Sequence, residues 1–132
     1  MKDTSKPTFV PQLIIPHRTM DIDFYKNAFG AIELRRFSND DGSIHVAEFE
    51  IGGAIFHLHE ENVNKGAYSP ARHNGITAII GLMVADVDAV MGSAIAAGAK
   101  ELSPAKSYDY GYRQGDLLDP FGHQWLIEMV IV

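Results

Sequence analysis

The residues best suited to chemistry are an imidazole and a carboxylate that the chain brings together across a tight turn. Gly52-Gly53 separates two runs in which apolar and polar residues alternate, a pattern typical of a two-residue hairpin turn. Pairing across that turn places Glu48 opposite His57, where the carboxylate can orient the imidazole as a general base or as a donor that grips a ligand. A surface pair contributing only about 0–1 kcal/mol to stability is an equally good interpretation.

Alternation along this hairpin predicts one apolar face and one polar face, because successive strand residues point to opposite sides of a sheet. The apolar face carries Ala47, Phe49, Ile51, Phe56 and Leu58. The polar face carries Val46, Glu48, Glu50, Ile55, His57 and His59. We expect the apolar side chains to pack beneath a helix, whereas the polar face of an antiparallel sheet ordinarily lies open to solvent. A slip of one residue at the turn would exchange the two faces.

The elements that position this hairpin occur in the same order twice along the chain. The first set is a strand over residues 10–15, a helix capped by Thr19 and closed by Gly30, and strands over residues 31–37, 43–51 and 54–59. The second set is a strand over residues 76–84, a helix over residues 87–97 closed by Gly98, and strands beginning at Lys100, Arg113 and Gln124. The five residues from Gly30 match the five from Gly98 at four positions, which favours duplication over chance.

Composition limits the class of protein. The chain has 132 residues, 46% hydrophobic and 21% charged, so it can bury the core of one ordinary domain. A net charge of −6, with no basic run longer than Arg35-Arg36, argues against a nucleic-acid partner. Cys is absent, which excludes thiolate chemistry and suits a reducing cytoplasm. The longest apolar run, residues 78–85, is shorter than the ~20 residues of a membrane span, and the polar N-terminus lacks a signal-peptide pattern. We expect a cytoplasmic protein that does not bind membranes.

Five short motifs carry a resemblance to a known family. They are FYKNAFGA at residues 24–31, VADVDA at 84–89, AGA at 97–99, YGYR at 110–113 and DPFGHQW at 119–125. Together they resemble the vicinal oxygen chelate superfamily, which holds glyoxalases, bleomycin-resistance proteins and extradiol dioxygenases, and they are most similar to its PhnB-like branch. The resemblance covers residues 10–129 and describes the fold more closely than the chemistry, since one fold hosts many functions.

This resemblance implies an α+β fold in a single domain over residues 8–132. Two βαβββ modules, residues 8–61 and 75–132, are expected to be related by a pseudo-twofold axis and joined by a loop over residues 62–74. Their curled mixed sheets would surround a cleft, with the helices outside. The polar face of the hairpin then lines the cleft instead of facing open solvent.

The second module can be aligned on the first through its turn. Gly122 corresponds to Gly53, so Trp125 corresponds to Phe56 and is expected to anchor the core, as large aromatic residues commonly do. By the same alignment the cleft side of the last strand carries Gln124, Leu126 and Glu128, while Ile127 joins Trp125 in the core.

Metal-using relatives place one ligand on the first strand and one on the last strand of each module. The equivalent positions here are Val10, His57, Ile79 and Leu126. Only His57 can bind a metal ion, and catalytic metal sites ordinarily have about three protein ligands, so this alignment predicts that the site has been lost.

A shift of two residues keeps the same faces and gives another set. It consists of Gln12, His59, Gly81 and Glu128, of which Gln12, His59 and Glu128 are of ligand type. Nitrogen and oxygen donors of this kind would suit Ni²⁺, Mn²⁺, Fe²⁺ or Zn²⁺. A divalent-metal site is therefore kept as the alternative.

The favoured function is binding of a small molecule without a cofactor, as in bleomycin-resistance-like relatives, in a cleft shared by two subunits of a homodimer. The predicted ligand-binding residues are Gln12, Glu48, His57, His59 and Glu128. The acidic side chains on the cleft side suit a cationic ligand. The alternative is a metal-dependent lyase, isomerase or dioxygenase that uses Gln12, His59 and Glu128. Whether the protein catalyses a reaction is left open.

Four further histidines are expected to have structural or solvent-exposed positions. His45 falls on the apolar side of its strand, where a hydrogen-bonded structural histidine is expected. His17 and His73 lie in loops and are expected to be solvated. His123 lies in the turn before the last strand and is expected to make hydrogen bonds within that turn.

Overall fold

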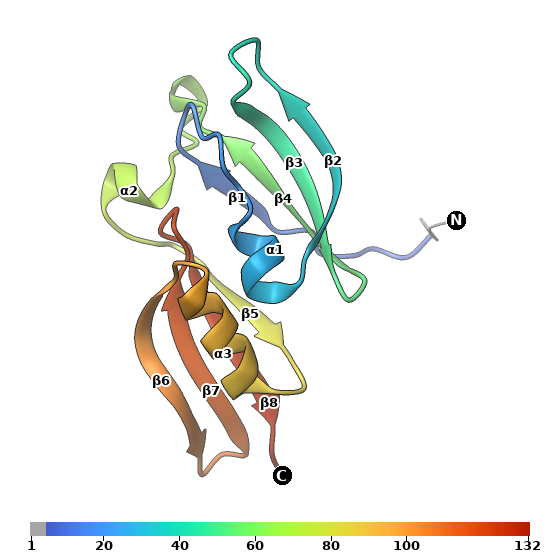
Figure 1. Ribbon diagram of the computed structural model, residues 1–132, viewed down its shortest axis with the longest axis vertical. Helices are drawn as coiled ribbons and strands as arrows, with labels where there is room; N and C mark the ends of the chain where they lie inside the picture. Colours follow the sequence, from blue (N-terminus) through green and yellow to red (C-terminus); the bar gives the residue numbers. More distant parts are fainter. Residues whose placement is uncertain (1–4) are drawn as a thin grey trace.

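Two four-stranded mixed sheets, each with a helix on one face, make up the structure (Figure 1). The computed structural model describes residues 5–132. The first sheet has the order β1-β4-β3-β2 and comprises β1 (Gln12–Ile15), β2 (Ile32–Ser38), β3 (Ile44–Ile51) and β4 (Ala54–Glu60). The second has the order β5-β8-β7-β6 and comprises β5 (Ile79–Met83), β6 (Lys100–Tyr108), β7 (Tyr112–Leu118) and β8 (Gln124–Val130). The predicted α+β fold with a repeated strand-helix-strand order is confirmed.

The helices lie on the same side of the molecule. Helix α1 (Phe24–Phe29) covers the first sheet and α3 (Val87–Ala96) the second, and the two helices contact each other (Figure 1). The segment between the sheets, predicted as a loop, contains the 3₁₀ helix η1 (Val63–Lys65) and the short helix α2 (Pro70–His73). None of the helices formed by residues 5–132 is both long and apolar enough to span a lipid bilayer.

The hairpin of β3 and β4 has the predicted register. Ile51 pairs with Ala54 and Glu48 pairs with His57. Gly52 and Gly53 have φ angles of 53° and 89°, the left-handed conformations that a type I′ turn requires and that glycine adopts without steric cost. The turn therefore determines which face of the sheet every side chain of the hairpin occupies.

An aromatic core lies between the sheets and the helices. Phe49 and Phe56 are stacked 5.5 Å apart, and both are buried, as predicted. Tyr25 of α1 is fully buried against Phe56 of the first sheet and Trp125 of the second, with ring centroids 5.2 and 5.9 Å away. Trp125 is the predicted core anchor, and it joins the two modules in one continuous core.

A buried carboxylate also joins the modules. Asp119, in the turn before β8, accepts hydrogen bonds from the Tyr25 hydroxyl at 2.6 Å and from Trp125 Nε1 at 3.0 Å. The backbone N–H groups of Phe121 and His123 donate to the other carboxylate oxygen. The side chain of His123 does not stay within its turn as predicted: its Nε2 lies 2.7 Å from the carbonyl oxygen of Ile14 in β1.

The first helix begins later than the sequence predicts. Its N-cap is Asp23, not Thr19. The Thr19 hydroxyl instead donates to the carbonyl of Pro16 at 2.7 Å, and Asp21 accepts from the Asp23 N–H at 2.8 Å. These local hydrogen bonds make a turn that competes with helix. Gly30 closes the helix at φ 67°, as expected.

His45 also departs from its predicted position. The pairing of β2 with β3 is irregular near this residue, where Phe37 pairs with Val46 but Ser38 pairs with Ile44. The irregularity breaks strict alternation, so Ile44 takes the buried position. The His45 side chain is 55% exposed and contacts Glu60.

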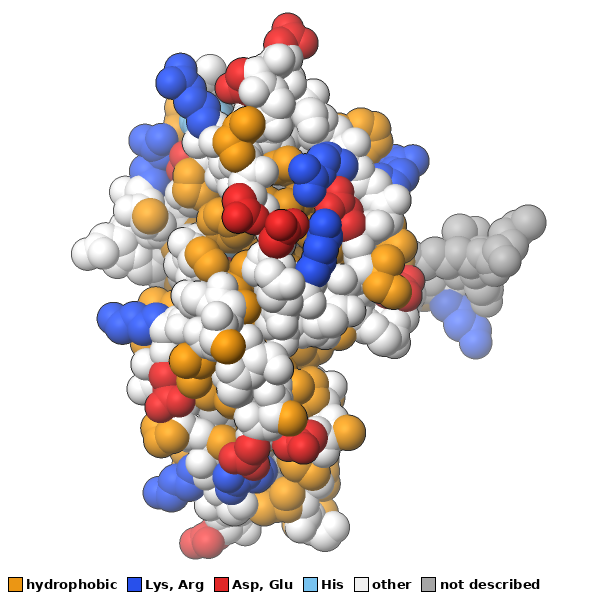
Figure 2. All heavy atoms as spheres, in the orientation of Figure 1, with side chains coloured by type: hydrophobic (Ala, Val, Ile, Leu, Met, Phe, Trp, Pro, Cys, Tyr) orange, Lys and Arg blue, Asp and Glu red, His pale blue; other side chains and the backbone are white. Residues whose placement is uncertain are grey.

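Charged side chains of both signs lie next to one another on the helix-bearing face (Figure 2). Between α1 and β2, Glu33 lies 2.7 Å from Arg36 Nε and 3.0 Å from Lys26 Nζ. Hydrogen bonding from Arg36 is the main reason why the pKa of Glu33 is lowered, and Lys26 adds to the effect against the opposing influence of burial. These pairs make the charges in this region mutually compensating.

Candidate functional site

A line of polar side chains crosses the first sheet on the face opposite the helices. Gln12 of β1 pairs with His57 of β4, which pairs with Glu48 of β3. The side chains follow the same order: Gln12 Nε2 lies 3.1 Å from His57 Nδ1, and His57 Nε2 lies 3.8 Å from a Glu48 oxygen. Arg35 of β2 ends the line, 3.3 Å from the other Glu48 oxygen. Adjacent strands thus hold four polar groups in fixed order.

Hydrogen bonding selects one tautomer of His57. Gln12 Nε2 also donates to the carbonyl oxygen of Val10 at 3.3 Å, and since a carbonyl can only accept, the amide nitrogen must be the group on this side. His57 Nδ1 is then the acceptor for Gln12, and the ring proton lies on Nε2, toward Glu48. With 24% of its side chain exposed, His57 can present this Nε2–H to a ligand.

His59 lies on the same face, two residues further along β4. It pairs with Ile14 in β1 and with Val46 in β3. Its ring centroid is 6.5 Å from that of His45. Partial burial is the main cause that lowers the pKa of His59, and the nearby imidazoles of His45 and His57 lower it further. The site therefore favours a neutral His59 ring, which can accept a hydrogen bond.

Glu128 belongs to the second sheet. It accepts a hydrogen bond from Gln114 Nε2 at 2.8 Å, and the Tyr110 hydroxyl donates to the Gln114 carbonyl oxygen. Gly81 of β5 makes room for the carboxylate, because a Cβ atom at that position would lie 3.1 Å from Glu128 Oε2. The contacts of the first sheet unite Gln12, Glu48 and His57; Glu128 stands in a separate hydrogen-bonded group.

Sequence reasoning did not identify Gln114 and Tyr110 as site residues. Gln114 pairs directly with Glu128 across β7 and β8. The pairing of Glu128 with its cross-strand neighbour could have identified Gln114 from the sequence. The turn over residues 119–123, however, does not define a strand register as a Gly-Gly hairpin does. Tyr110 stood within a family-like motif without an assigned role.

The structure does not pair the residues of either inferred ligand set as the sequence alignments placed them. Across residues 5–132, no three His, Asp or Glu side chains are arranged to hold a metal ion. The structure pairs Gln12 with His57 and Gly81 with Leu126, a combination that neither sequence alignment contains. Gln12 and Glu128 both make hydrogen bonds within their own sheets.

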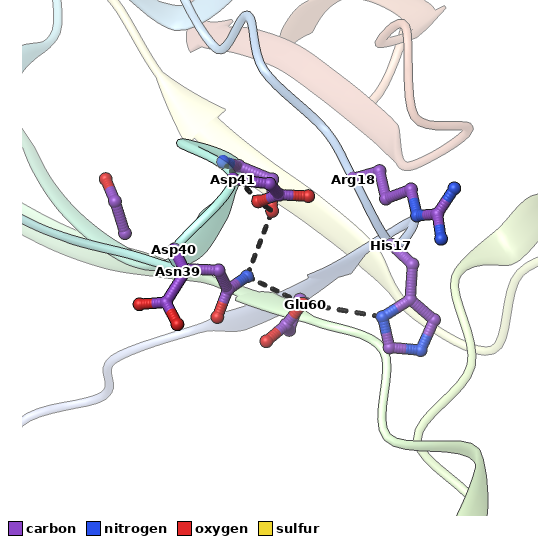
Figure 3. A pocket seen from close by; sticks show the side chains of 8 residues that line it. His17, Arg18, Asn39, Asp40, Asp41 and Glu60 are labelled. Atoms are coloured by element: carbon purple, nitrogen blue, oxygen red, sulfur yellow. Dashed lines mark hydrogen bonds and ion pairs between the residues drawn. The ribbon is translucent and has the colours of Figure 1, made fainter.

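A polar pocket of about 820 Å³ lies at the end of the first sheet (Figure 3). At its centre, Glu60 is within hydrogen-bond distance of His45 at 2.7 Å, Asn39 at 3.2 Å and His17 at 3.4 Å. Burial alone would raise the pKa of Glu60, but these contacts outweigh it and the pKa is lowered. His17, predicted to be solvated, is half-exposed and makes this contact. Protein groups therefore already occupy most of the hydrogen-bonding capacity of the Glu60 carboxylate.

Comparison with known proteins agrees with this architecture. The model of the Glyoxalase/Bleomycin resistance protein/Dioxygenase superfamily matches residues 15–127. An uncharacterized protein of Mycobacterium bovis is 33% identical over 123 residues, covering 91% of this chain and 81% of the relative. An uncharacterized protein of Mycobacterium tuberculosis has the same identity, with 72% of the relative covered.

Solved structures share the fold. A gene product of Arabidopsis thaliana is 25% identical, with a TM-score of 0.68 over 92% of this chain and 98% of that one. TioX from Micromonospora sp. ML1 is 22% identical, with a TM-score of 0.67 over 94% of this chain and 100% of that one. With two βαβββ modules and a family model that matches most of its length, the chain belongs to the glyoxalase/bleomycin resistance protein/dioxygenase superfamily.

Proposed function

We propose that this protein binds a small molecule in a cleft lined by the polar faces of its two sheets, without a resident metal ion. The observation that carries the proposal is the ordered line Gln12, His57, Glu48 on the face opposite the helices. His57 offers a hydrogen-bond donor, and the lowered pKa of His59 supports an acceptor beside it. Oriented polar groups on an open sheet face suit ligand recognition.

The ligand is expected to carry positive charge. Glu48, Glu50 and Glu128 lie on the proposed cleft side of the strands, and Glu128 has an amide as its hydrogen-bond partner instead of a cation. A ligand cation placed beside Glu128 would therefore supply the missing countercharge.

The proposal includes a homodimer in which the cleft is shared between subunits. Ile79 and Met83 of β5 are 53% and 55% exposed on the same strand face as Gly81. Exposed apolar side chains and open sheet edges favour association. Sedimentation velocity at tens of micromolar should show a dimer, and a strict monomer would contradict this part of the proposal. Membership of the PhnB-like branch and a cytoplasmic location stay predictions.

Thermal unfolding with added ligands tests the function. A ligand that binds only the folded state stabilises it by about 2.7 kcal/mol when present at about 100 times its Kd. We expect an organic cation that also carries a hydroxyl or carbonyl acceptor, from a panel of quaternary ammonium, guanidinium and amidinium compounds, to raise the Tm of the wild type but not of His57→Ala, because the acceptor loses its donor. His17→Ala, altered outside the cleft, should respond like the wild type.

Metal analysis separates the two candidate functions. We expect the purified protein to lack a stoichiometric divalent metal, and Ni²⁺, Mn²⁺, Fe²⁺ and Zn²⁺ to leave its Tm unchanged. A stoichiometric metal whose removal lowers the Tm, with the effect lost in His59→Ala or Glu128→Gln, would instead support the metal-dependent lyase, isomerase or dioxygenase.

A further inference from the structure

A second cavity lies where the two modules meet. This junction pocket has a volume of about 370 Å³ and is bounded by β1, by the segment that runs from Tyr68 into β5, and by His123 in the turn before β8. Small-molecule sites ordinarily enclose about 300–1,000 Å³. The junction pocket shares Gln12 with the site on the first sheet, but it is built mainly from residues that the proposed function does not use.

The walls combine apolar side chains with a few polar groups. Leu13 and Ile80 contribute apolar surface from the two modules, and Tyr68, His73 and His123 contribute polar groups. Mostly apolar lining with a small number of hydrogen-bonding groups is the composition by which small-molecule sites are recognised.

The two imidazoles are held in defined tautomers. His123 Nε2 lies 2.7 Å from the Ile14 carbonyl oxygen, and His73 Nε2 lies 2.9 Å from the Gly75 carbonyl oxygen. Because a carbonyl only accepts, each Nε2 must carry the hydrogen. In the neutral rings each Nδ1 is then the acceptor that remains for a ligand, so these two lining residues can select a ligand with a hydrogen-bond donor.

One wall of the pocket is fixed before any ligand arrives. Helix α2, which contains His73, is tied to the end of β4 through Glu61. That buried carboxylate accepts from Arg72 Nε at 2.8 Å and from the Ser69 N–H and hydroxyl at 2.9 and 3.0 Å. A wall that is already ordered reduces the entropy lost on binding.

We propose that the junction pocket is a second binding site, for a small uncharged molecule with an apolar body and one hydroxyl donor, of the phenol class. The apolar walls receive the ring, and the hydroxyl donates to Nδ1 of His73. Apart from Gln12, this site is built from residues outside the proposed cation-binding cleft, and the proposal does not rest on the proposed function.

The test compares 4-ethylphenol with 4-ethylanisole, in which a methoxy group replaces the hydroxyl and removes the donor. NMR titration of the full-length protein at pH 8 should show saturable shifts of the His73 and His123 ring signals with the phenol. Loss of a hydrogen bond should make the anisole bind about tenfold more weakly. Equal affinity for the two compounds, or no saturable shift with either, would overturn the proposal.

Variants locate the binding site. His73 is exposed, so His73→Phe should fold normally and bind the phenol about tenfold more weakly. Tyr68→Ala, a second variant in the same wall, should also weaken binding of the phenol. His17→Ala and Glu48→Gln should bind the phenol like the wild type. A loss of binding in Glu48→Gln with full binding in His73→Phe would place the phenol in the cleft and refute a junction site, whereas failure of the cation assay would leave this result unaffected.

Discussion

Neighbouring residues in β4 have opposite functions in the first sheet. Phe56 is 4% exposed and contacts the rings of Tyr25, Phe49 and Trp125. His57, the next residue, lies on the other face and contacts Gln12. At the scale of single residues, the strand thus places stability on one face and candidate ligand contacts on the other.

Alanine variants at these two positions should separate stability from binding. Phe56→Ala removes a ring from the shared core and should cost about 3–5 kcal/mol of unfolding free energy. His57→Ala should leave the unfolding free energy nearly unchanged but weaken ligand binding. Urea denaturation measures the unfolding free energies of both variants, and the thermal-shift assay with ligand measures binding. If the His57 variant unfolded as readily as the Phe56 variant, the assignment of the two faces would be wrong.

Glu61 gives a prediction about pH. Hydrogen bonding by Arg72 is the main cause that lowers the pKa of Glu61 from 4.5 to about 2, with Ser69 assisting and burial opposing. Since the folded state holds the lower pKa, the unfolded state binds more protons between these values, and stability falls as pH drops from about 5 toward 2. The contribution is complete above this window.

The matched variant is Glu61→Gln, which keeps the shape of the side chain but cannot ionise. It should be less stable than the wild type by about 2–3 kcal/mol at pH 7, and the difference should shrink as the pH approaches 2. Urea unfolding from pH 7 to pH 2.5 measures this. Glu101→Gln, at an exposed position in β6, serves as control. A difference that stayed constant over the range would show that the charge of Glu61 has no role.

At the scale of elements, the turn between β3 and β4 determines which faces are buried. Gly52 has a φ of 53°, and a Cβ atom there would have no heavy atom outside the turn within 4 Å. A substitution therefore changes backbone energy without creating a clash. The residue type decides how large that energy is, because Asn tolerates the left-handed conformation and β-branched residues do not.

Two substitutions at Gly52 test this interpretation. Gly52→Asn should change the unfolding free energy by less than about 0.5 kcal/mol, since Asn-Gly is a favoured type I′ sequence. Gly52→Val should cost about 1–2 kcal/mol. Thermal or urea unfolding distinguishes them, and equal costs would argue against the left-handed turn.

At the scale of the whole molecule, the modules are expected to fold as one unit. Asp119 of the second module binds Tyr25 of the first, and burial raises the pKa of the Tyr25 phenol well above 10, with the neighbouring carboxylate adding to the effect. The phenol therefore stays protonated and donates its hydrogen bond under ordinary conditions.

Removing that donor should weaken both modules together. Tyr25→Phe leaves Asp119 with one hydrogen bond fewer and should cost about 1–3 kcal/mol, with a single cooperative transition retained. A fragment ending at Glu61 should lack a cooperative transition, because a module of about 60 residues buries too little surface alone. Cooperative unfolding of that fragment as a monomer, measured by circular dichroism, would contradict the expectation.

The repeated order of elements, the register of the β3–β4 hairpin and the burial of three aromatic residues could be predicted from the sequence; these residues are Phe49, Phe56 and Trp125. These features follow from short-range chemistry: glycines that permit a type I′ turn, and alternation that assigns each side chain to a face. Alternation was insufficient at His45, where the irregular β2–β3 pairing buries Ile44 instead.

Contacts between residues distant in the sequence depend on how the strands and modules pack. Gln12 reaches His57 because β1 pairs in parallel with β4, 45 residues away, and no turn sets the register of a pairing at that separation. The Asp119–Tyr25 hydrogen bond and the His123 contact with Ile14 arise from the packing of one module on the other. Such contacts depend on the energy of the whole packed arrangement, so local sequence patterns carry no signal for them.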